Sequence, residues 1–317
     1  MLNNFIKNLS SRNGAAKLAL VIVVILIIPK VLVAIITHSV SVYAQTADSF
    51  LDLFSIGVIV IALRMSADPA DEKHPFGHGK MEGFAALIQA LLVLSAGAVI
   101  IYSAVQRLIH RTVINPDTGI FVMAVSAITS FLLYRHLLRV AKATGSTAIE
   151  ASARMFLADG YSAAGVLLGL VAVLLTNWQI LDPIIALLIA ILVLREGYQI
   201  VPRAFRELTD YSLPKNEQNI LNDCIRENFT QFVSFHNVRS RRAGSERFVD
   251  LHLVMPRHFS VEDAHKMCDH LEQDIKTKLP NTNVVIHVEP CSENDCVGCY
   301  IKVCDLQKMQ NRTRWLK

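Results

Sequence analysis

Long apolar runs fill the chain up to about residue 202 and predict membrane-spanning helices. Six such runs can be placed, at about 17–37, 41–63, 84–106, 118–140, 151–176 and 180–195. The first four are clear by hydropathy alone, whereas only a short turn divides the last two. An apolar run of about 20 residues can cross the hydrocarbon core of a bilayer, which is roughly 30 Å thick. We therefore expect a membrane domain of six helices.

From Leu213 onward the hydrophobic pattern is that of a soluble α+β domain. It predicts helices at 215–229 and 260–279, and strands at 235–239, 247–255 and 283–288. Ser260 is a suitable N-cap, and Asp263 at the third helical position completes a variant of the capping box. The order α-β-β-α-β favours a small open-faced sandwich.

Composition supports this division of the chain. The 317 residues are 52% hydrophobic, with a mean hydropathy of +0.39 that is too high for an ordinary soluble protein. We expect a membrane domain at 1–210, a cytosolic domain at 211–290 and a cysteine-rich tail at 291–317. The net charge of +4 is mild and gives no reason to expect a nucleic-acid partner.

The distribution of basic residues predicts the orientation in the membrane. Lys and Arg are concentrated in the 64–83 loop, in the 135–150 region and after the sixth run. Such loops stay on the cytoplasmic side, so both termini and the tail are expected in the cytoplasm. The first run lacks a small-residue cleavage motif and is too long for a signal peptide, so we interpret it as the first span.

Two carboxylates lie inside the second apolar run. Asp48 and Asp52 are four residues apart, so a helix places them on one face. A carboxylate at that depth costs at least ~2.5 kcal/mol, and two neighbours also repel each other. The pair is tolerable if it lines a water-filled path, shares a proton or holds a cation; the simpler alternative is a polar contact between helices. Asp159 lies about eight residues into the fifth run, which crosses in the opposite direction, so all three acids can meet near mid-membrane.

The loop after the second run offers a second set of metal ligands. Asp71, His74 and His78 supply one carboxylate and two imidazoles within eight residues, a set suited to Zn²⁺ or a similar divalent metal. Gly77 and Gly79 allow the tight turns that would bring them together. The simpler alternative is a polar cytosolic loop that happens to contain two histidines.

The predicted cytosolic domain carries a third set. Its members stand on different predicted elements: His236, His252, His265 and His287, with Glu289 on the same strand face as His287. Neutral imidazole is the commonest metal ligand. Any one of these histidines is explained equally well as an ordinary surface or core residue, whereas the group together predicts a metal site.

These motifs resemble those of the cation diffusion facilitator family, close to its bacterial zinc and ferrous-iron efflux members. The resemblance covers about residues 10–291 and rests on three features: the Asp48-xxx-Asp52 pair, the Pro-Ala-Asp…His-Pro-Phe-Gly-His-Gly-Lys loop, and a terminal Val-Ile-His-Val-Glu-Pro. It implies a homodimer in the bacterial inner membrane, with six transmembrane helices and a metallochaperone-like α+β cytosolic domain. It also implies exchange of a divalent metal for protons by alternating access.

The resemblance further assigns roles to residues. The transport site would be Asp48, Asp52 and Asp159, and the loop site Asp71, His74 and His78. The sites of the cytosolic domain would draw on His236, His252, His265, His287 and Glu289. Lys80 and Asp210 match the positions of a charge interlock across the dimer.

One position departs from the family's pattern. The fifth span usually carries His-xxx-Asp, and here the residues are Met155-xxx-Asp159. Three carboxylates alone favour Mn²⁺ or Fe²⁺, whereas a thioether ligand would favour softer ions. Met155 is also explained as a packing residue. Loss of the histidine leaves proton coupling to the carboxylates.

A second departure is the tail sequence Cys291-x4-Cys296-xx-Cys299-x4-Cys304. Four thiols kept reduced in the cytoplasm suit a closed tetrahedral Zn²⁺ site or an iron–sulfur cluster. Alternatively, Cys291 joins His287 and Glu289, or the thiols are simply free.

We therefore expect a metal/proton antiporter, with Zn²⁺ first and Fe²⁺ or Mn²⁺ as alternatives. The metal is both substrate and regulator, and no other cofactor is expected. A Gly-rich nucleotide loop of the required spacing is missing, which argues against an ATP-driven pump. The chain offers no Ser/His/Asp arrangement, which argues against an intramembrane hydrolase, and we expect no enzymatic activity. The alternative function is a membrane-anchored metal sensor or scaffold with an altered transport site.

Overall fold

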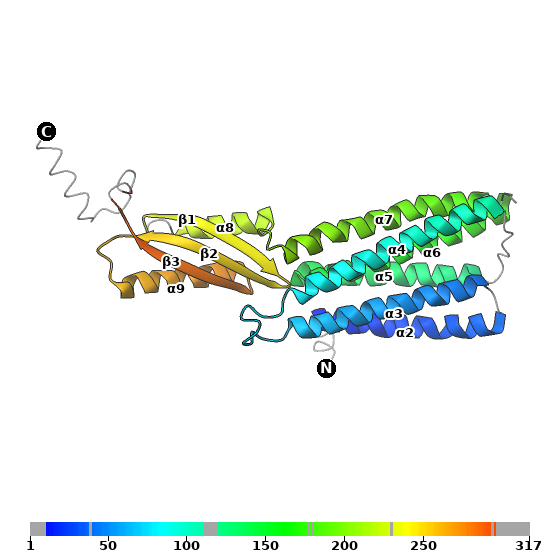
Figure 1. The fold of residues 1–317 in the computed structure, drawn as a ribbon, viewed down its shortest axis with the longest axis horizontal. Coiled ribbons are helices and arrows are strands. Elements are labelled where there is room, and N and C mark those ends of the chain that lie inside the picture. Colours follow the sequence, from blue (N-terminus) through cyan, green and yellow to red (C-terminus); the bar gives the residue numbers. More distant parts are fainter. Residues whose placement is uncertain are drawn as a thin grey trace, which may run out of the picture. The chain divides into compact units, whose positions relative to one another are not determined.

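The computed structural model describes residues 11–37, 40–110, 119–176, 178, 180–228, 231–292 and 295. The chain divides into two compact units at the Thr209–Asp210 bond. Figure 1 labels the helices and strands of both units.

The first unit is a bundle of long helices. Its six described helices are α2 (Arg12–Thr37), α3 (Val40–Ser66), α4 (Met81–His110), α5 (Gly119–Thr144), α6 (Thr147–Thr176) and α7 (Leu181–Leu208). The shortest has 26 residues, about 39 Å at 1.5 Å per residue, which exceeds the thickness of a bilayer core. Each of the six predicted runs corresponds to one of these helices.

Within the described residues, four segments have both the length and the apolar composition needed to cross a membrane. They are Ser49–Ser66 of α3, Met81–His110 of α4, Thr147–Val173 of α6 and Leu181–Leu208 of α7. Helix α7 continues to Leu208, well beyond residue 195, where the sequence pattern predicted its end. Beyond that point its buried face continues through Glu196, which is paired with Arg154 of α6, and through Ile200 and Ala204.

Close packing joins α4, α6 and α7, which lie side by side in Figure 1. A Cβ atom at Gly97 of α4 would lie 2.6 Å from Leu194 Cδ2 of α7, so a larger residue there would force the Leu194 side chain to move. Gly165 of α6 accommodates Ile189 of α7 in the same way. The buried core of the bundle includes Ile56, Ile59, Leu63, Leu137 and Ile149.

The second unit contains α8 (Lys215–Glu227), β1 (Ser234–Ala243), β2 (Glu246–Met255), α9 (Val261–Lys278) and β3 (Thr282–Pro290). The strands lie in the order β1-β2-β3, with β1 antiparallel and β3 parallel to the central β2. The predicted α-β-β-α-β order is confirmed. The predicted cap is confirmed as well, because Ser260 Oγ accepts a hydrogen bond from the Asp263 amide at 3.1 Å.

Alternation along β2 gives the sheet one apolar face. Val249, Leu251 and Leu253 are at most 1% exposed and pack with Leu271 and Ile275 of α9. The β1–β2 hairpin is longer than predicted, because the paired ladder continues to Ala243↔Glu246 through residues with no apolar alternation. Gly244 at its turn has a φ of +60°, a conformation that favours glycine.

An ion-pair cluster holds α8 against this hairpin. Glu217 of α8 accepts hydrogen bonds from Arg247 at 2.9 and 3.1 Å and from Arg242 at 2.5 Å. Burial works to raise the pKa of Glu217, but the hydrogen bonds and charges of Arg247 and Arg242 outweigh it and lower the pKa below its ordinary value of 4.5. The charged form is therefore the one that stabilises the fold.

We expect Glu217→Gln to destabilise the second unit by about 1–2 kcal/mol at neutral pH, a figure reduced from that of a fully buried pair because solvent screens the charges. Because the folded-state pKa is lowered, this stabilisation is complete above pH 4.5 and is lost as the pH falls below it. Amide hydrogen exchange of β2 in the whole protein, compared at equal pH, measures the difference. The exposed Glu246→Gln is the control, and a difference that persists unchanged at pH 3 would contradict the assignment.

Candidate metal centres

The intramembrane acids lie on helices that pack against each other. Asp52 of α3 and Asp159 of α6 are both half-buried, and α3 contacts α6. The side chain of Asp48 lies outside the described residues. Ser49 and Ser55, each at most 3% exposed, flank Asp52 at intervals of three residues and continue its polar stripe along α3. Half-buried carboxylates within apolar helices can bind a cation or a proton.

Met155 lies one helical turn before Asp159 and is only 3% exposed. Its sulfur accepts a hydrogen bond from the side-chain amide of Gln89 on α4, which is 1% exposed. The thioether therefore has a polar partner within the bundle. Our sequence analysis did not single out Gln89, although an isolated amide within an apolar run was the available signal.

A buried carboxylate marks the start of α4. Glu82 is completely buried. Its carboxylate oxygens accept hydrogen bonds from Arg12 at 2.6 Å, from Ser66 at 3.4 Å and from Ser146. These partners come from α2, from α3 and from the corner between α5 and α6. Glu82 thus connects the ends of several helices, a role that sequence spacing alone does not reveal.

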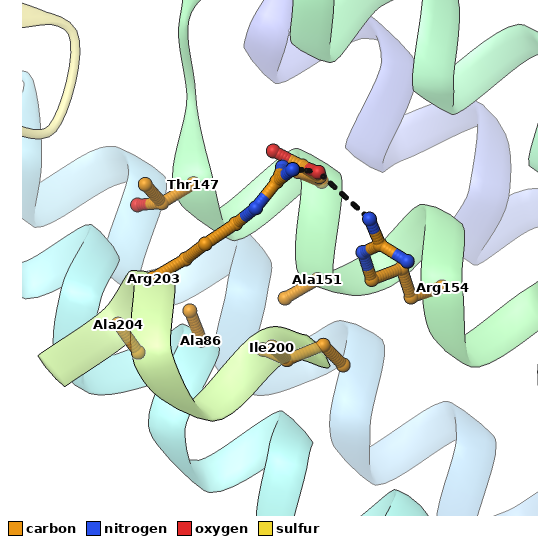
Figure 2. Close-up of a pocket in the computed structure, with 8 residues that line it drawn as sticks. Ala86, Thr147, Ala151, Arg154, Ile200, Arg203 and Ala204 are labelled. Carbon is orange, nitrogen blue, oxygen red and sulfur yellow. Dashed lines mark hydrogen bonds and ion pairs between the residues drawn. The ribbon is translucent and has the colours of Figure 1, made fainter. Parts of the chain in front are cut away.

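A second ionic network joins α6 to α7. Arg154 contacts Glu196 at 2.7 Å and Gln199 at 2.8 Å, while Glu150 pairs with Arg203. Figure 2 shows the side chains of Arg154 and Arg203, which both pair with Glu150, beside a cavity of about 10 Å³ that has room for about one water molecule. Thr147 and Arg154 both line it, and their buried atoms Thr147 Oγ1 and Arg154 Nε have no hydrogen-bond partner within the described part of the chain.

The 67–80 loop brings its three predicted ligands together. The ligand atoms of Asp71, His74 and His78 lie within 4.8 Å of one another. Asp71 is 3.2 Å from His74 Nδ1 and 3.6 Å from His78 Nε2. Gly77, with a φ of +76°, makes the turn between the histidines. The arrangement is compatible with one divalent ion.

Electrostatics at this loop favours a charged carboxylate. A hydrogen bond from the backbone amide of His74 is the largest influence on Asp71 and lowers its pKa, aided by the Lys73 amide and partly opposed by burial. The buried Nδ1 of His78 has no hydrogen-bond partner among the described residues. An ionised carboxylate beside two imidazoles is a suitable ligand set for Zn²⁺.

The open face of the sheet carries a ladder of three histidines. His236, His252 and His287 are direct partners across β1, β2 and β3. Glu289 lies 2.8 Å from His252, 3.4 Å from His236 and 3.8 Å from His287. The ligand atoms of His236, His252 and Glu289 lie within 4.8 Å of one another, so these three can share an ion.

His265 is not in this group. It lies on α9, 72% exposed, and its ring is 3.5 Å from Asp269 one turn further on. Among the described residues it belongs to neither ligand group, so its contribution to a metal site stays a prediction.

Of the four tail cysteines, the structure describes Cys291 alone. Cys291 is 3% exposed and packs with Val233 and Val254, and it is in neither of the two ligand groups found among the described residues. Cys296, Cys299 and Cys304 lie outside the described part of the chain. Between Cys291 and Cys296 lies Asp295, whose pKa is lowered by hydrogen bonds from the Ser292 hydroxyl and amide and also by the charge of His236.

The two residues of the predicted interlock have other neighbours within the chain. Lys80 Nζ lies 3.4 Å from the Leu208 carbonyl oxygen in the first unit. Asp210 pairs with Arg241 at 3.1 Å in the second unit. A contact across a dimer therefore stays a prediction.

We expect His252→Ala to weaken Zn²⁺ binding at the sheet at least ~10-fold, because His252 is the central member of the ladder and the residue nearest Glu289. Calorimetric titration of the purified full-length protein would show one fewer tight site. His270→Ala on α9 serves as the control. An unchanged number of tight sites in His252→Ala would rule out this centre.

Comparison with known proteins identifies the family. The model of the cation efflux transmembrane domain matches residues 16–209, and that of the cytoplasmic domain of cation efflux proteins matches residues 213–291. The cation-efflux pump FieF of Escherichia fergusonii is 31% identical over 292 residues, which cover 92% of this chain and 96% of that protein. An uncharacterized transporter of Synechocystis sp. is 30% identical over 263 residues, which cover 81% and 84% of the two chains.

Among solved structures, the metal-bound C-terminal domain of the CzcD transporter from Thermotoga maritima is 25% identical and covers 28% of this chain and 100% of its own, with a TM-score of 0.23. The family models and the two relatives that span most of the chain carry the assignment. The chain belongs to the cation diffusion facilitator family of cation efflux transporters, with a transmembrane domain followed by a cytoplasmic domain.

Proposed function

We propose that this transporter exchanges a divalent metal ion from the cytoplasm for protons from the far side of the membrane. The observation that carries the proposal is the pair Asp52 and Asp159, half-buried on packed apolar helices. Asp48, on the same helix as Asp52, would complete the ligand set. The family is one of transporters rather than enzymes.

Proton exchange follows from the chemistry of these ligands. Carboxylates must lose their protons to bind metal, so metal binding and protonation compete for the same oxygens. A metal that enters from the cytoplasm would displace protons from the site. When the metal leaves on the other side, the carboxylates would take up protons and return in that form.

Zn²⁺, Fe²⁺ and Mn²⁺ are the candidate cargoes. Carboxylate oxygens suit Mn²⁺ and Fe²⁺, while Zn²⁺ is more often bound by nitrogen or sulfur. The loop and sheet centres have imidazole ligands, so we infer that they respond to cytoplasmic metal and influence transport. The protein would act as a homodimer in the bacterial inner membrane with both termini in the cytoplasm, in keeping with its cytoplasmic domain.

Transport into proteoliposomes tests the proposal. Metal uptake and luminal pH are recorded together for Zn²⁺, Fe²⁺, Mn²⁺, Co²⁺ and Cd²⁺ with an imposed proton gradient, and protein-free vesicles serve as the control. We expect uptake of at least one metal, accompanied by opposite movement of protons that stops when the gradient is collapsed.

Two results would contradict antiport. Metal uptake without proton movement would indicate a uniporter or channel. Zn²⁺ binding to the His236–His252–Glu289 group without uptake of any metal would favour the alternative, a membrane-anchored sensor, because this ligand group is the feature that such a protein would need.

A further inference from the structure

An amide and a thioether meet between α4 and α6, where both side chains are almost completely excluded from solvent. Gln89 is 1% exposed and Met155 is 3% exposed. The amide Nε2 of Gln89 donates a hydrogen bond to Met155 Sδ. The contact joins residues 66 positions apart, so it is a product of tertiary packing rather than of local sequence.

This contact places strong constraints on both residues. A buried amide is costly unless its hydrogens find acceptors. The thioether sulfur is a weak acceptor, and it is the one that Gln89 Nε2 uses. The amide therefore holds the sulfur, and the sulfur partly satisfies the amide.

The contact lies next to the proposed transport site. Met155 precedes Asp159 by four residues on α6, so the two side chains lie on one face of the helix, one turn apart. A sulfur at that position is near enough in sequence to compete for a metal held by Asp159.

We propose that Gln89 determines the metal selectivity of the transport site, by engaging the Met155 sulfur and so keeping it from coordinating the ion. The inference rests on the function proposed above and deepens it. The ligands that remain are carboxylate oxygens, which favour Mn²⁺ and Fe²⁺ over the soft ion Cd²⁺. For the sulfur to reach a metal, the buried amide would have to lose its acceptor, which opposes that arrangement.

The test compares Cd²⁺ with Mn²⁺ in the full-length protein. Gln89→Leu removes the amide while keeping a side chain of similar volume, and it should release the sulfur. We expect the ratio of Cd²⁺ to Mn²⁺ uptake in proteoliposomes to rise roughly 10-fold. Met155→Leu in the Gln89→Leu background should return the ratio to that of the unmodified protein. Gln106→Leu, elsewhere on α4, is the matched control and should leave the ratio unchanged.

X-ray absorption at the cadmium edge supplies a readout that is independent of transport. All variants contain the same six cysteines, so a sulfur contribution that changes between them belongs to Met155. We expect additional sulfur around Cd²⁺ in Gln89→Leu, and loss of that contribution in the double variant. If Gln89→Leu does not fold, Gln89→Ala is measured in the same way.

The outcomes separate the two proposals. Uptake with an unchanged ratio, or no added sulfur in Gln89→Leu, would overturn the role of Gln89 and leave antiport standing. Added sulfur in Gln89→Leu without uptake of any metal by the unmodified protein would support the role of Gln89 at a binding site and reject antiport. Cadmium–sulfur coordination that is lost on changing Met155 in the unmodified protein would also overturn the inference.

Discussion

Asp159→Asn is expected to reduce metal uptake at least ~100-fold while leaving the protein folded. Asparagine has nearly the same shape as aspartate, so the packing of α6 should persist. It has no negative charge to attract a divalent cation and no carboxylate proton to exchange. Metal uptake and proton counterflow should therefore disappear together, because both depend on the same group.

The measurement is uptake into proteoliposomes at a fixed proton gradient, with luminal pH followed in the same sample. Asp223→Asn, an exposed residue of α8, is the matched control and should retain full uptake. Size-exclusion chromatography establishes that each variant is folded. Full uptake by Asp159→Asn would remove this residue from the transport site, and metal uptake without proton movement would assign it to coupling alone.

The second large effect is expected from Glu82→Gln. The change removes the negative charge that pairs with Arg12. The Arg12 guanidinium, whose side chain is only 28% exposed, is then left without a carboxylate partner. Removing one partner of a buried ion pair typically lowers the free energy of unfolding by about 3 kcal/mol or more. For a domain of this size we expect the apparent melting temperature to fall by roughly 6–12 °C.

Thermal unfolding of the detergent-solubilised protein, followed by loss of the monodisperse chromatographic peak, measures this effect. Glu72→Gln in the exposed loop is the control. Arg12→Leu combined with Glu82→Leu should recover much of the loss, because a buried ion pair can often be replaced by apolar side chains. A melting temperature for Glu82→Gln within about 2 °C of the unmodified protein would show that the charge is not structural.

Hydrophobic periodicity predicted the fold class well, and the family resemblance is confirmed. The six apolar runs, the order of elements in the cytoplasmic domain and the Ser260 cap are all local patterns, and local patterns are visible in sequence. The end of α7 could not be predicted in this way. The charged Glu196 that interrupts the apolar pattern has its partner in Arg154, 42 positions earlier, and that pairing is not visible in the local sequence.

The candidate sites show the same difference between what local sequence predicts and what tertiary packing decides. Asp71, His74 and His78 lie close in sequence, and the loop brings them together as their spacing suggested. His236, His252 and Glu289 meet because of strand register, which spacing does not specify. The contact of Gln89 with Met155 could not be inferred from sequence, since it depends on how α4 and α6 are packed. The roles of all these residues in transport stay predictions.

The glycine contacts of α7 have a mechanical consequence. Leu194 fits where Gly97 leaves room on α4, and Ile189 fits where Gly165 leaves room on α6. A side chain lodged in such a notch resists sliding along its neighbour, because a shift of one residue would drive it into a larger side chain. Sliding α7 past either neighbour would therefore displace Leu194 or Ile189 from its contact. A movement that keeps both contacts carries α4, α6 and α7 together.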